Sequence, residues 1–216
     1  MTAVAKKGFF ITLEGGEGAG KSTLARGLQQ KFEEKNITVV MTREPGGTPK
    51  GEEIRKVLLS GAASKMGSMT EALLFAAARD EHLKEIIRPA LEEDKVVICD
   101  RFADSTRVYQ GYVGGVERQM IERMDKLIVG DTQPDLTFIV DIAPEKGLAR
   151  VKLRAGRTDR FESEEIGFHR KIRAAFFDIA SRFPERCIIL DGEQTPDAML
   201  EKAWNALAEH RGFAKE

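Results

Sequence analysis

A glycine-rich motif that follows an apolar run is the feature that most constrains how this chain can fold. Residues 15–22 read G-G-E-G-A-G-K-S and match the pattern G-x-x-x-x-G-K-[ST], and the apolar run 8–13 comes directly before them. The motif requires a strand before it and a helix after it, and Leu24, Leu28 and Phe32 repeat at the spacing of a helix face. Glycines let backbone N–H groups turn inward around phosphate oxygens, and the positive end of the following helix adds to the attraction. This context predicts a phosphate-binding loop and disfavours the alternative, a glycine-rich turn that only packs tightly.

Five short apolar runs predict the strands of a parallel sheet. They lie at 8–13, 37–41, 95–99, 136–140 and 187–190, and longer segments with helical spacing separate them. Continuous runs rich in valine and isoleucine are typical of strands buried on both faces. The alternation of strands and helices therefore predicts an α/β fold with helices on both faces of the sheet. At 216 residues, without a repeat or linker, the chain is expected to form one domain.

Each of the five runs ends at a charged residue. In open α/β sheets, ligands bind beyond the carboxyl ends of the strands. We therefore expect all five polar strand ends to point to one crevice. The residues concerned are Glu14, Arg43, Glu44, Asp100, Arg101, Asp141 and Asp191.

The charge balance and the cysteines limit the class of partner. Lysine and arginine number 34 against 35 acidic residues, so the net charge of -1 gives no overall field to hold a nucleic-acid backbone. Cys99 and Cys187 lie in or beside apolar runs, which is typical of buried, reduced thiols in a cytoplasmic protein. Residues 1–7 lack the long apolar stretch of a signal peptide, and no segment approaches the roughly 18 apolar residues that span a bilayer. We expect a cytoplasmic protein with no nucleic-acid and no membrane partner.

The phosphate loop predicts a bound nucleotide but leaves the fate of its γ-phosphate open. Lys21 is expected to bridge the β- and γ-phosphates, and Ser22 to ligate Mg²⁺. The base-reading N-K-x-D and the D-x-x-G of a GTPase switch are both missing from the sequence. The charged strand ends and further arginines favour a kinase that holds a second anion opposite the loop. Two alternatives remain: a kinase for another small acceptor, such as a different nucleoside monophosphate or a deoxynucleoside, and a switch protein that binds ATP without turnover.

Six segments resemble bacterial thymidylate kinase in their order and spacing. They read LEGGEGAGKST (13–23), TREPGGT (42–48), LLFAAARDEH (73–82), DRFADSTRVYQG (100–111), PDLTFIVDI (134–142) and GRTDRFE (156–162). Many families share the phosphate loop, but its combination with the second and fourth segments is specific, and the match covers nearly the whole chain. The resemblance implies a single P-loop nucleoside monophosphate kinase domain over 1–216, with a lid at about 150–163. It also implies that the protein phosphorylates dTMP to dTDP with ATP and Mg²⁺, and that it forms a homodimer.

On the donor side, the resemblance places the phosphate loop and two further positions around ATP. Asp100 is expected to hold Mg²⁺ through water, next to Ser22, or to orient the neighbouring arginine. Arg150 would lie against adenine. Asp191 would shape the adenine site, or would only form part of a turn and helix cap. The ATP-binding set is then Gly15, Gly16, Glu17, Gly18, Ala19, Gly20, Lys21, Ser22, Thr23, Arg150 and Asp191.

On the acceptor side, two residues of the third segment are candidates for contacts with the base. Phe75 and Arg79 are four residues apart, so they share one face of a helix. An aromatic ring can stack on a pyrimidine while a guanidinium donates to a base carbonyl, and the resemblance implies that these two residues hold thymine. The alternatives are core packing for Phe75 and a surface pair with Asp80 for Arg79. Arg101 can bind the 5′-phosphate of the acceptor bidentately, or can form a strand-terminal salt bridge.

The remaining acceptor residues depend more strongly on the resemblance. Ser105 and Thr106 carry short hydroxyls that can reach a base edge, and Tyr109 occupies a position that crowds the ribose 2′ site in related enzymes. Thr106 and Gln110 could also simply cap or pack a helix. Asp159 and Glu162 are acceptor-side or metal-shell candidates, and Arg43 and Pro45 would wall the pocket. The acceptor set is Glu17, Arg43, Pro45, Phe75, Arg79, Arg101, Ser105, Thr106, Tyr109, Gln110 and Asp159.

An acidic residue inside the phosphate loop bears on the source of the catalytic positive charge. Glu17 opposes the charge of ATP, so we expect it to point away from the ATP phosphates, and the resemblance puts it on the acceptor side. Some family members carry an arginine directly after this acid, where this chain has Gly18. The basic stretch 150–160, with a glycine inside it, therefore predicts a mobile lid, although such a run alone could be a solvated helix face. Arg154 or Arg157 would act on the γ-phosphate, so the catalytic set is Lys21, Arg101, Arg154 and Arg157.

Overall fold

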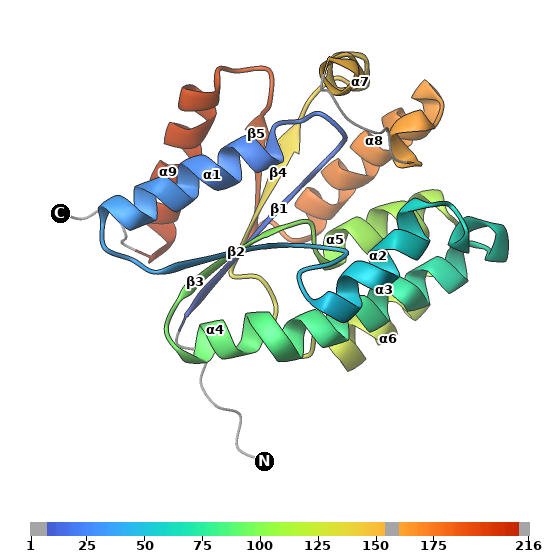
Figure 1. Cartoon of the computed structure of the whole chain (residues 1–216). Coiled ribbons are helices and arrows are strands. Elements are labelled where there is room, and N and C mark those ends of the chain that lie inside the picture. Colours follow the sequence, from blue (N-terminus) through green and yellow to red (C-terminus); the bar gives the residue numbers. More distant parts are fainter. Residues whose placement is uncertain (1–7, 154–159, 212–216) are drawn as a thin grey trace.

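The computed structural model describes residues 8–153 and 160–211, and a parallel sheet of five strands forms its centre (Figure 1). The spatial order is β2-β3-β1-β4-β5, and all neighbouring pairs are parallel. The strands are β1 (Phe9–Gly15), β2 (Val39–Arg43), β3 (Val96–Asp100), β4 (Leu136–Asp141) and β5 (Cys187–Asp191). The five predicted strands and the α/β fold are thus confirmed. All five strands include the charged residue that follows the apolar run, because the ladder continues to these positions. In β1 the ladder extends one residue further, past Glu14 to Gly15.

Helices connect the strands, as the spacing of apolar residues predicts. The start of α2 carries a side-chain cap and a proline. The hydroxyl of Thr48 accepts from the N–H of Gly51 at 3.0 Å, and Pro49 takes the first helical position. Short 3₁₀ turns lie at Ala63–Met66 and Phe161–Ser163, and π-helical segments at Leu83–Ile87 and Arg107–Val113. The α-helices of the described residues are α1 (Lys21–Glu34), α2 (Pro49–Leu59), α3 (Ser68–His82), α4 (Arg88–Glu92), α5 (Ala103–Thr106), α6 (Arg118–Ile128), α7 (Pro144–Lys152), α8 (Ile166–Arg182) and α9 (Pro196–Arg211).

The central strand β1 alternates between two apolar cores. Phe9, Ile11 and Leu13 pack with residues of α1 and α9, whereas Phe10 packs with the segment that leads into α4. This alternation follows from the period of two in a strand, where successive side chains point to opposite faces. Figure 1 shows α1 and α9 on one side of the sheet and α3, α4 and α8 on the other. The sheet is therefore covered on both faces, and the functional surface lies at an edge.

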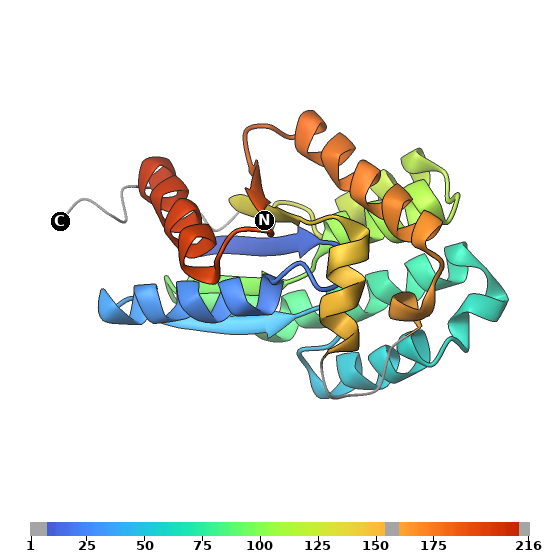
Figure 2. The same ribbon diagram turned by 90° about the horizontal axis from the view of Figure 1, so that it is seen from above.

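The phosphate loop leaves β1 at the carboxyl edge of the sheet, and α7 lies just beyond the tip of that strand (Figure 2). The loop and α7 pack backbone against backbone. A Cβ atom on Gly147 would lie 2.3 Å from the carbonyl oxygen of Glu17, and a Cβ atom on Gly18 would lie 2.1 Å from the carbonyl oxygen of Gly147. Because no side chain fits between them, α7 fixes the outer side of the loop.

We expect Gly147→Ala to lower the free energy of unfolding by about 1–3 kcal/mol, the usual effect of overpacking, because the added methyl group must push the loop away from α7. The matched control is Gly167→Ala at the start of α8, where a Cβ atom would meet no atom within 4 Å. Alanine favours a helix over glycine, so this control should be neutral or slightly stabilising. Urea unfolding of both variants measures the difference. Equal stabilities would mean that the loop is not held by α7.

Candidate active site

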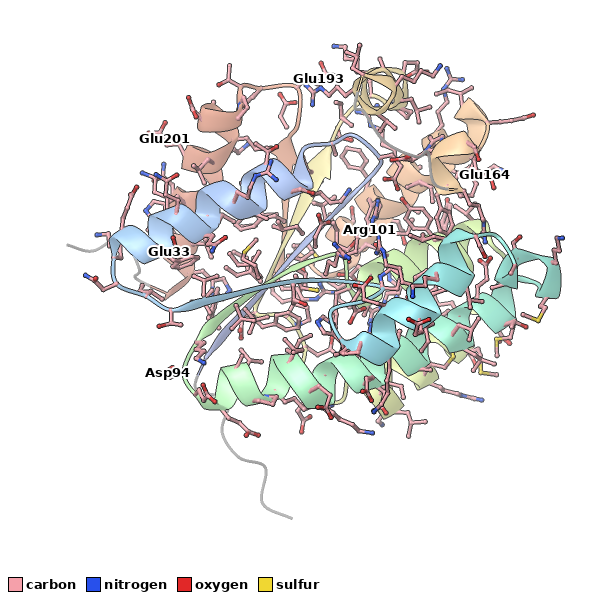
Figure 3. All side chains as sticks on the ribbon, viewed as in Figure 1. Glu33, Asp94, Arg101, Glu164, Glu193 and Glu201 are labelled. Atoms are coloured by element: carbon pink, nitrogen blue, oxygen red, sulfur yellow. The ribbon has the colours of Figure 1, made fainter. Side chains whose placement is uncertain are left out.

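A cleft of about 790 Å³ opens at the carboxyl edge of the sheet, within the usual size range of small-ligand sites. It extends from the phosphate loop to α3, and Figure 3 shows Arg101 near the middle of the molecule, by the ends of the strands. One end is lined by Gly18 to Thr23, Arg26, Arg150, Gly192, Gln194, Pro196 and Met199. The other end is lined by Glu17, Arg43, Glu44, Pro45, Arg55, Leu59, Phe75, Arg79, Asp100, Arg101, Phe102, Ser105, Thr106, Tyr109, Gln110, Phe161 and Glu162.

Lys21 is held at the start of α1 by carbonyl groups of the phosphate loop. Its ammonium donates to the carbonyl oxygens of Gly15 at 3.1 Å and Gly16 at 2.8 Å. Gly20 has a φ angle of 105°, a left-handed conformation that favours glycine, and among the described residues no side chain caps this end of α1. The first N–H groups of the helix are therefore available to an anion beside the lysine cation. Burial and the charge of Arg101 both lower the pKa of Lys21.

A hydroxyl and a carboxylate meet beside the phosphate loop. Oγ of Ser22 donates to Oδ2 of Asp100 at 2.8 Å, which joins the first turn of α1 to the end of β3. Mg²⁺ prefers oxygen ligands, and in ATP sites it takes one or two from the protein and the others from phosphates and water. The described residues contain no group of three or more His, Cys, Asp or Glu that could hold a metal. The hydroxyl of Ser22 and the carboxylate of Asp100 are oxygen donors of the kind that Mg²⁺ prefers.

Glu17 points from the phosphate loop towards the end of β3 and the segment after α5. Its Oε1 accepts from Nη2 of Arg101 at 2.5 Å and from the hydroxyl of Tyr109 at 2.9 Å. Burial alone would raise the pKa of Glu17, but the charges of Arg101 and Lys21 outweigh it and lower the pKa from 4.5 to about 2. Glu17 is therefore ionised at neutral pH. Arg101 thus forms an ion pair at the end of β3, as its alternative predicts, and its partner is Glu17.

Arg79 and Phe75 line the cleft from one face of α3, as their spacing predicts. Arg79 is only 2% exposed, and its Nε donates to Oε2 of Glu44 at 2.8 Å. The alternative of a surface pair with Asp80 is wrong, because Asp80 instead accepts from Lys84 at 2.6 Å. Phe75 is half-buried and also packs against the apolar cluster between α8 and the segment after α5. Its ring therefore contributes both to packing and to the wall of the cleft.

Thr106 and Gln110 line the cleft and hold neighbouring side chains. Oγ1 of Thr106 accepts from Nη2 of Arg79 at 3.1 Å, and Nε2 of Gln110 donates to Oε2 of Glu71 at 3.3 Å. Both residues are buried. They therefore form part of the surface of the pocket, and they also fix the orientation of the charged side chains around it.

Ser105 differs from the expected contact with a base edge. Its hydroxyl donates to Oε2 of Glu14 at 2.6 Å and accepts from Nη1 of Arg101 at 3.3 Å. The single hydroxyl hydrogen is already used, so the residue is committed to its protein neighbours. The prediction is corrected accordingly: Ser105 lines the cleft but serves Glu14 and Arg101.

Arg43 and Pro45 line the cleft beyond the end of β2. Nη2 of Arg43 lies 3.0 Å from Oε1 of Glu52, and the arginine side chain is 55% exposed. Pro45 is buried, and its carbonyl oxygen accepts from Nη1 of Arg55 at 2.7 Å. Both residues therefore lie at the wall of the cleft, with Pro45 fixed and Arg43 at the solvent-exposed rim, and their role towards the acceptor stays a prediction.

Three of the charged strand ends, Glu14, Asp141 and Asp191, do not line the cleft, which corrects the expected single crevice. Glu14 is fully buried. Asp141 accepts from Nε of Arg173 in α8 at 2.7 Å, and Asp191 accepts a backbone N–H of the following turn at 2.9 Å, so both carboxylates are used outside the cleft. Asp191 therefore forms part of a turn, which is the alternative to a role in the adenine site. Gly192 lines the cleft instead, and Nη1 of Arg150 donates to its carbonyl oxygen at 2.8 Å.

The predicted lid residues Arg154, Arg157 and Asp159 lie outside the described residues. Directly after them, Arg160 forms an ion pair with Glu71 of α3. Glu162 lines the cleft, and its role on the acceptor side or near the metal stays a prediction. The end of the predicted lid is therefore attached to α3.

Three buried carboxylates have partners that the sequence does not identify. Glu14, Glu44 and Asp104 are each at most 5% exposed. Asp104 accepts from Arg107 at 2.6 Å and from Arg186 at 2.7 Å. The available signal for the two glutamates is their place at the ends of buried strands, since a buried carboxylate requires a partner. Asp104 has no comparable signal in the sequence.

The fold and the site together define a P-loop kinase, in which the phosphate loop and Arg101 at the end of β3 line one cleft. A family model described as thymidylate kinase matches residues 13–203. This chain belongs to the thymidylate kinase family. The thymidylate kinase of Nitrobacter winogradskyi (strain Nb-255) is 48% identical over 207 residues, which cover 95% of this chain and 90% of that protein. That of Rhodopseudomonas palustris (strain CGA009) is 48% identical over 204 residues, covering 93% and 89%.

A solved structure supports the same assignment. The crystal structure of thymidylate kinase from Ehrlichia chaffeensis matches with a TM-score of 0.74 and 35% sequence identity, covering 93% of this chain and 98% of that chain. Cys99 and Cys187 are buried and free, as their apolar surroundings predict. In the part of the chain that the structure describes, no helix has the length and apolar character of a membrane span.

We expect Arg101→Ala to raise the pKa of Glu17, because burial would then face less opposing positive charge. The carboxyl carbon of Glu17, followed by NMR, should titrate near pH 2 in the wild-type protein and at a clearly higher pH in the variant. The stabilisation from ionised Glu17 should be complete above about pH 4.5 and be lost as the pH falls towards 2. Arg26→Ala, which alters another arginine of the cleft, is the control and should leave the titration unchanged. An unchanged titration in Arg101→Ala would contradict the assigned cause.

Proposed function

We propose that this chain transfers the γ-phosphoryl group of ATP to dTMP, giving ADP and dTDP for the synthesis of dTTP. Membership of the thymidylate kinase family supports this proposal. The structural observation that carries it is the position of Glu17, whose pKa is lowered by both Arg101 and Lys21. Lys21 of the phosphate loop and Arg101 at the end of β3 therefore lie close together in one cleft. Such a cleft suits two phosphate-bearing substrates.

The proposed mechanism requires alignment of two polyanions and cancellation of their repulsion. The acceptor phosphate is an anionic oxygen nucleophile near neutral pH, so no strong general base is needed. Lys21 and the first N–H groups of α1 would hold the donor phosphates, and Arg101 would bind the acceptor phosphate bidentately. Ser22 and Asp100 would hold Mg²⁺, which supplies positive charge to the phosphates when it is bound. Positioning and electrostatic stabilisation of this kind account for most of phosphoryl-transfer catalysis.

Phe75 and Arg79 are proposed to hold the thymine base. The ring of Phe75 would stack on the pyrimidine, and the guanidinium of Arg79 would donate to a base carbonyl. Tyr109 supports a deoxyribose nearby, because its hydroxyl is held by Glu17 and its ring packs edge-on against Phe161 at 5.2 Å. A tyrosine fixed in this way would obstruct a 2′-hydroxyl.

We expect ADP release to depend on dTMP, and kcat/KM for dTMP to exceed that for dUMP by roughly 10- to 200-fold, the range that one methyl group in an apolar pocket supplies. The assay compares dTMP, dUMP, dCMP, dGMP and dAMP. Phe75→Ala should raise the KM for dTMP more than the KM for ATP. Preference for a different monophosphate would favour the alternative kinase, and tight ATP binding without acceptor-dependent ADP release would favour a switch protein.

We also propose that the protein belongs to the subtype whose catalytic arginine is in the lid, with Arg154 or Arg157 acting on the transferred phosphoryl group. Two observations support this. Gly18 has a φ angle of 68° and contacts Gly147, so the loop has no room for an arginine at this position. The flanking arginines are already used, Arg150 by the carbonyl of Gly192 and Arg160 by Glu71.

The double variant Arg154→Ala/Arg157→Ala should lower kcat by about 10³-fold or more, the contribution of an arginine finger, and should barely change either KM. The two single variants then identify the acting residue. A matched control is Lys152→Ala, which removes an exposed cation from the same basic stretch. If the double variant keeps kcat within a few-fold of the parent, the lid supplies no catalytic charge.

We also propose that the working form is a homodimer in the cytoplasm. It acts on free nucleotides and has no nucleic-acid or membrane partner. Large apolar side chains are exposed on or beside α3 and α6, which contact each other, and they suit contact with a second copy. The residues are Met66, Met69, Leu73, Tyr112, Met120 and Leu127. The free cysteines suit a reducing compartment, and the net charge of -1 gives no general attraction to nucleic acid.

A further inference from the structure

Arg101 adopts a backbone conformation that a residue with a side chain disfavours. Its φ angle is 69°, in the left-handed region that glycine usually occupies, and it lies between the end of β3 and the start of α5. A residue other than glycine persists in this region only where the surrounding structure fixes it. The turn that carries Arg101 therefore depends on contacts from outside the turn.

Glu14, the penultimate residue of β1, provides such contacts to the segment directly after Arg101. Its fully buried carboxylate accepts three hydrogen bonds. Oε1 accepts from the N–H of Phe102 at 2.8 Å and from the N–H of Ser105 at 3.2 Å, and Oε2 accepts from the hydroxyl of Ser105 at 2.6 Å. On the other side, the N–H of Arg101 donates to the carbonyl oxygen of Leu13 at 2.9 Å. Two adjacent residues of β1 thus hold the backbone on both sides of the strained position.

Ser105 connects the same carboxylate to the guanidinium of Arg101. The hydroxyl that donates to Glu14 also accepts from Nη1 of Arg101 at 3.3 Å, and Nη1 donates to the carbonyl oxygen of Gly15 at 3.1 Å. A hydroxyl that donates to a carboxylate becomes a better acceptor, because hydrogen bonds in a chain polarise one another. The backbone and the side chain of Arg101 are therefore both tied to the end of β1.

We propose that Glu14 is a positioning residue, which holds the left-handed turn at Arg101 and, through Ser105, aims the guanidinium at the phosphate of the acceptor. The inference rests on the proposed function, because it takes the acceptor phosphate as the group that Arg101 binds. Glu14 does not line the cleft, so its effect on substrate must pass through these two residues. Burial and the nearby Asp104 raise the pKa of Glu14 to about 7, while the hydrogen bonds from Ser105 and Phe102 act to lower it.

The test separates the phosphate of the acceptor from its nucleoside. Dissociation constants for dTMP and thymidine are measured for the wild-type protein, Glu14→Gln and Ser105→Ala. The first variant keeps an oxygen for the two N–H groups but removes the charge. The second removes the hydroxyl that connects Glu14 to the guanidinium, and leaves the two backbone hydrogen bonds of Glu14 in place. Each should weaken dTMP by about tenfold or more, the effect of one hydrogen bond to a charged group, and should leave thymidine within about twofold. Ser181→Ala, which removes an exposed hydroxyl bonded within α8, is the control and should change neither ligand.

A double-mutant cycle decides whether the effect passes through Arg101. Added to Arg101→Ala, Ser105→Ala should weaken dTMP no further, because the positioned group is already absent. If the losses of affinity for dTMP are fully additive, the effect does not pass through Arg101 and the proposed role of Glu14 is overturned. The same holds if the single variants weaken the binding of dTMP and of thymidine equally. The proposed function fails separately, if the wild-type protein neither binds nor phosphorylates dTMP. A wild-type protein that does both, with an unchanged preference for dTMP over thymidine in both variants, would overturn only this inference.

Discussion

The ion pair between Glu17 and Arg101 is the interaction on which the geometry of the cleft depends. Nη2 of Arg101 lies 2.5 Å from Oε1 of Glu17, which joins the phosphate loop after β1 to the turn after β3. Burial disfavours each charge alone, so the two stabilise each other in the absence of substrate. Because the loop also packs directly against Gly147 of α7, it has little freedom to move. The part of the cleft proposed to bind ATP and the part proposed to bind dTMP are therefore joined by this one rigid contact.

A second layer of buried charges lies beneath the acceptor half. Glu44 accepts from Arg79 at 2.8 Å and lies 3.0 Å from Nδ1 of His82, whose Nε2 lies 2.6 Å from the hydroxyl of Thr42. Buried ion pairs often stabilise a fold no better than apolar side chains would, so stability alone does not explain this arrangement. Its consequence is that Arg79 can point in one direction only. The cleft thus gains a fixed donor at the position where the base is proposed to bind.

The parts of this structure that could be predicted from the sequence are those encoded within a contiguous segment. Each strand contains a short, mostly apolar run, and Phe75 and Arg79 share a helix face because they are four residues apart. The phosphate loop and the cation Lys21 are likewise specified within one motif. Local patterns of this kind do not depend on how distant segments meet.

The parts that could not be predicted depend on contacts between distant segments. Ser105 and Glu14 are separated by 91 positions, so nothing in the local sequence reveals that the serine hydroxyl is used by a buried carboxylate. Asp191 follows an apolar run just as Asp100 does, but its carboxylate accepts the N–H of Glu193 in the following turn, whereas that of Asp100 accepts from the hydroxyl of Ser22. The sequence marks both residues as strand ends, and only the contacts in the folded chain distinguish them.

The central claim is that one cleft holds the phosphates of ATP and dTMP face to face, between Lys21 and Arg101. The most direct measurement is the dissociation constant of a compound in which thymidine and adenosine are joined through a pentaphosphate chain, determined by isothermal titration calorimetry. If both nucleotides occupy the cleft in this arrangement, the compound should bind about 10²- to 10⁴-fold more tightly than ATP or dTMP alone, because the second contact becomes intramolecular. A compound that binds no more tightly than ATP alone would contradict the claim.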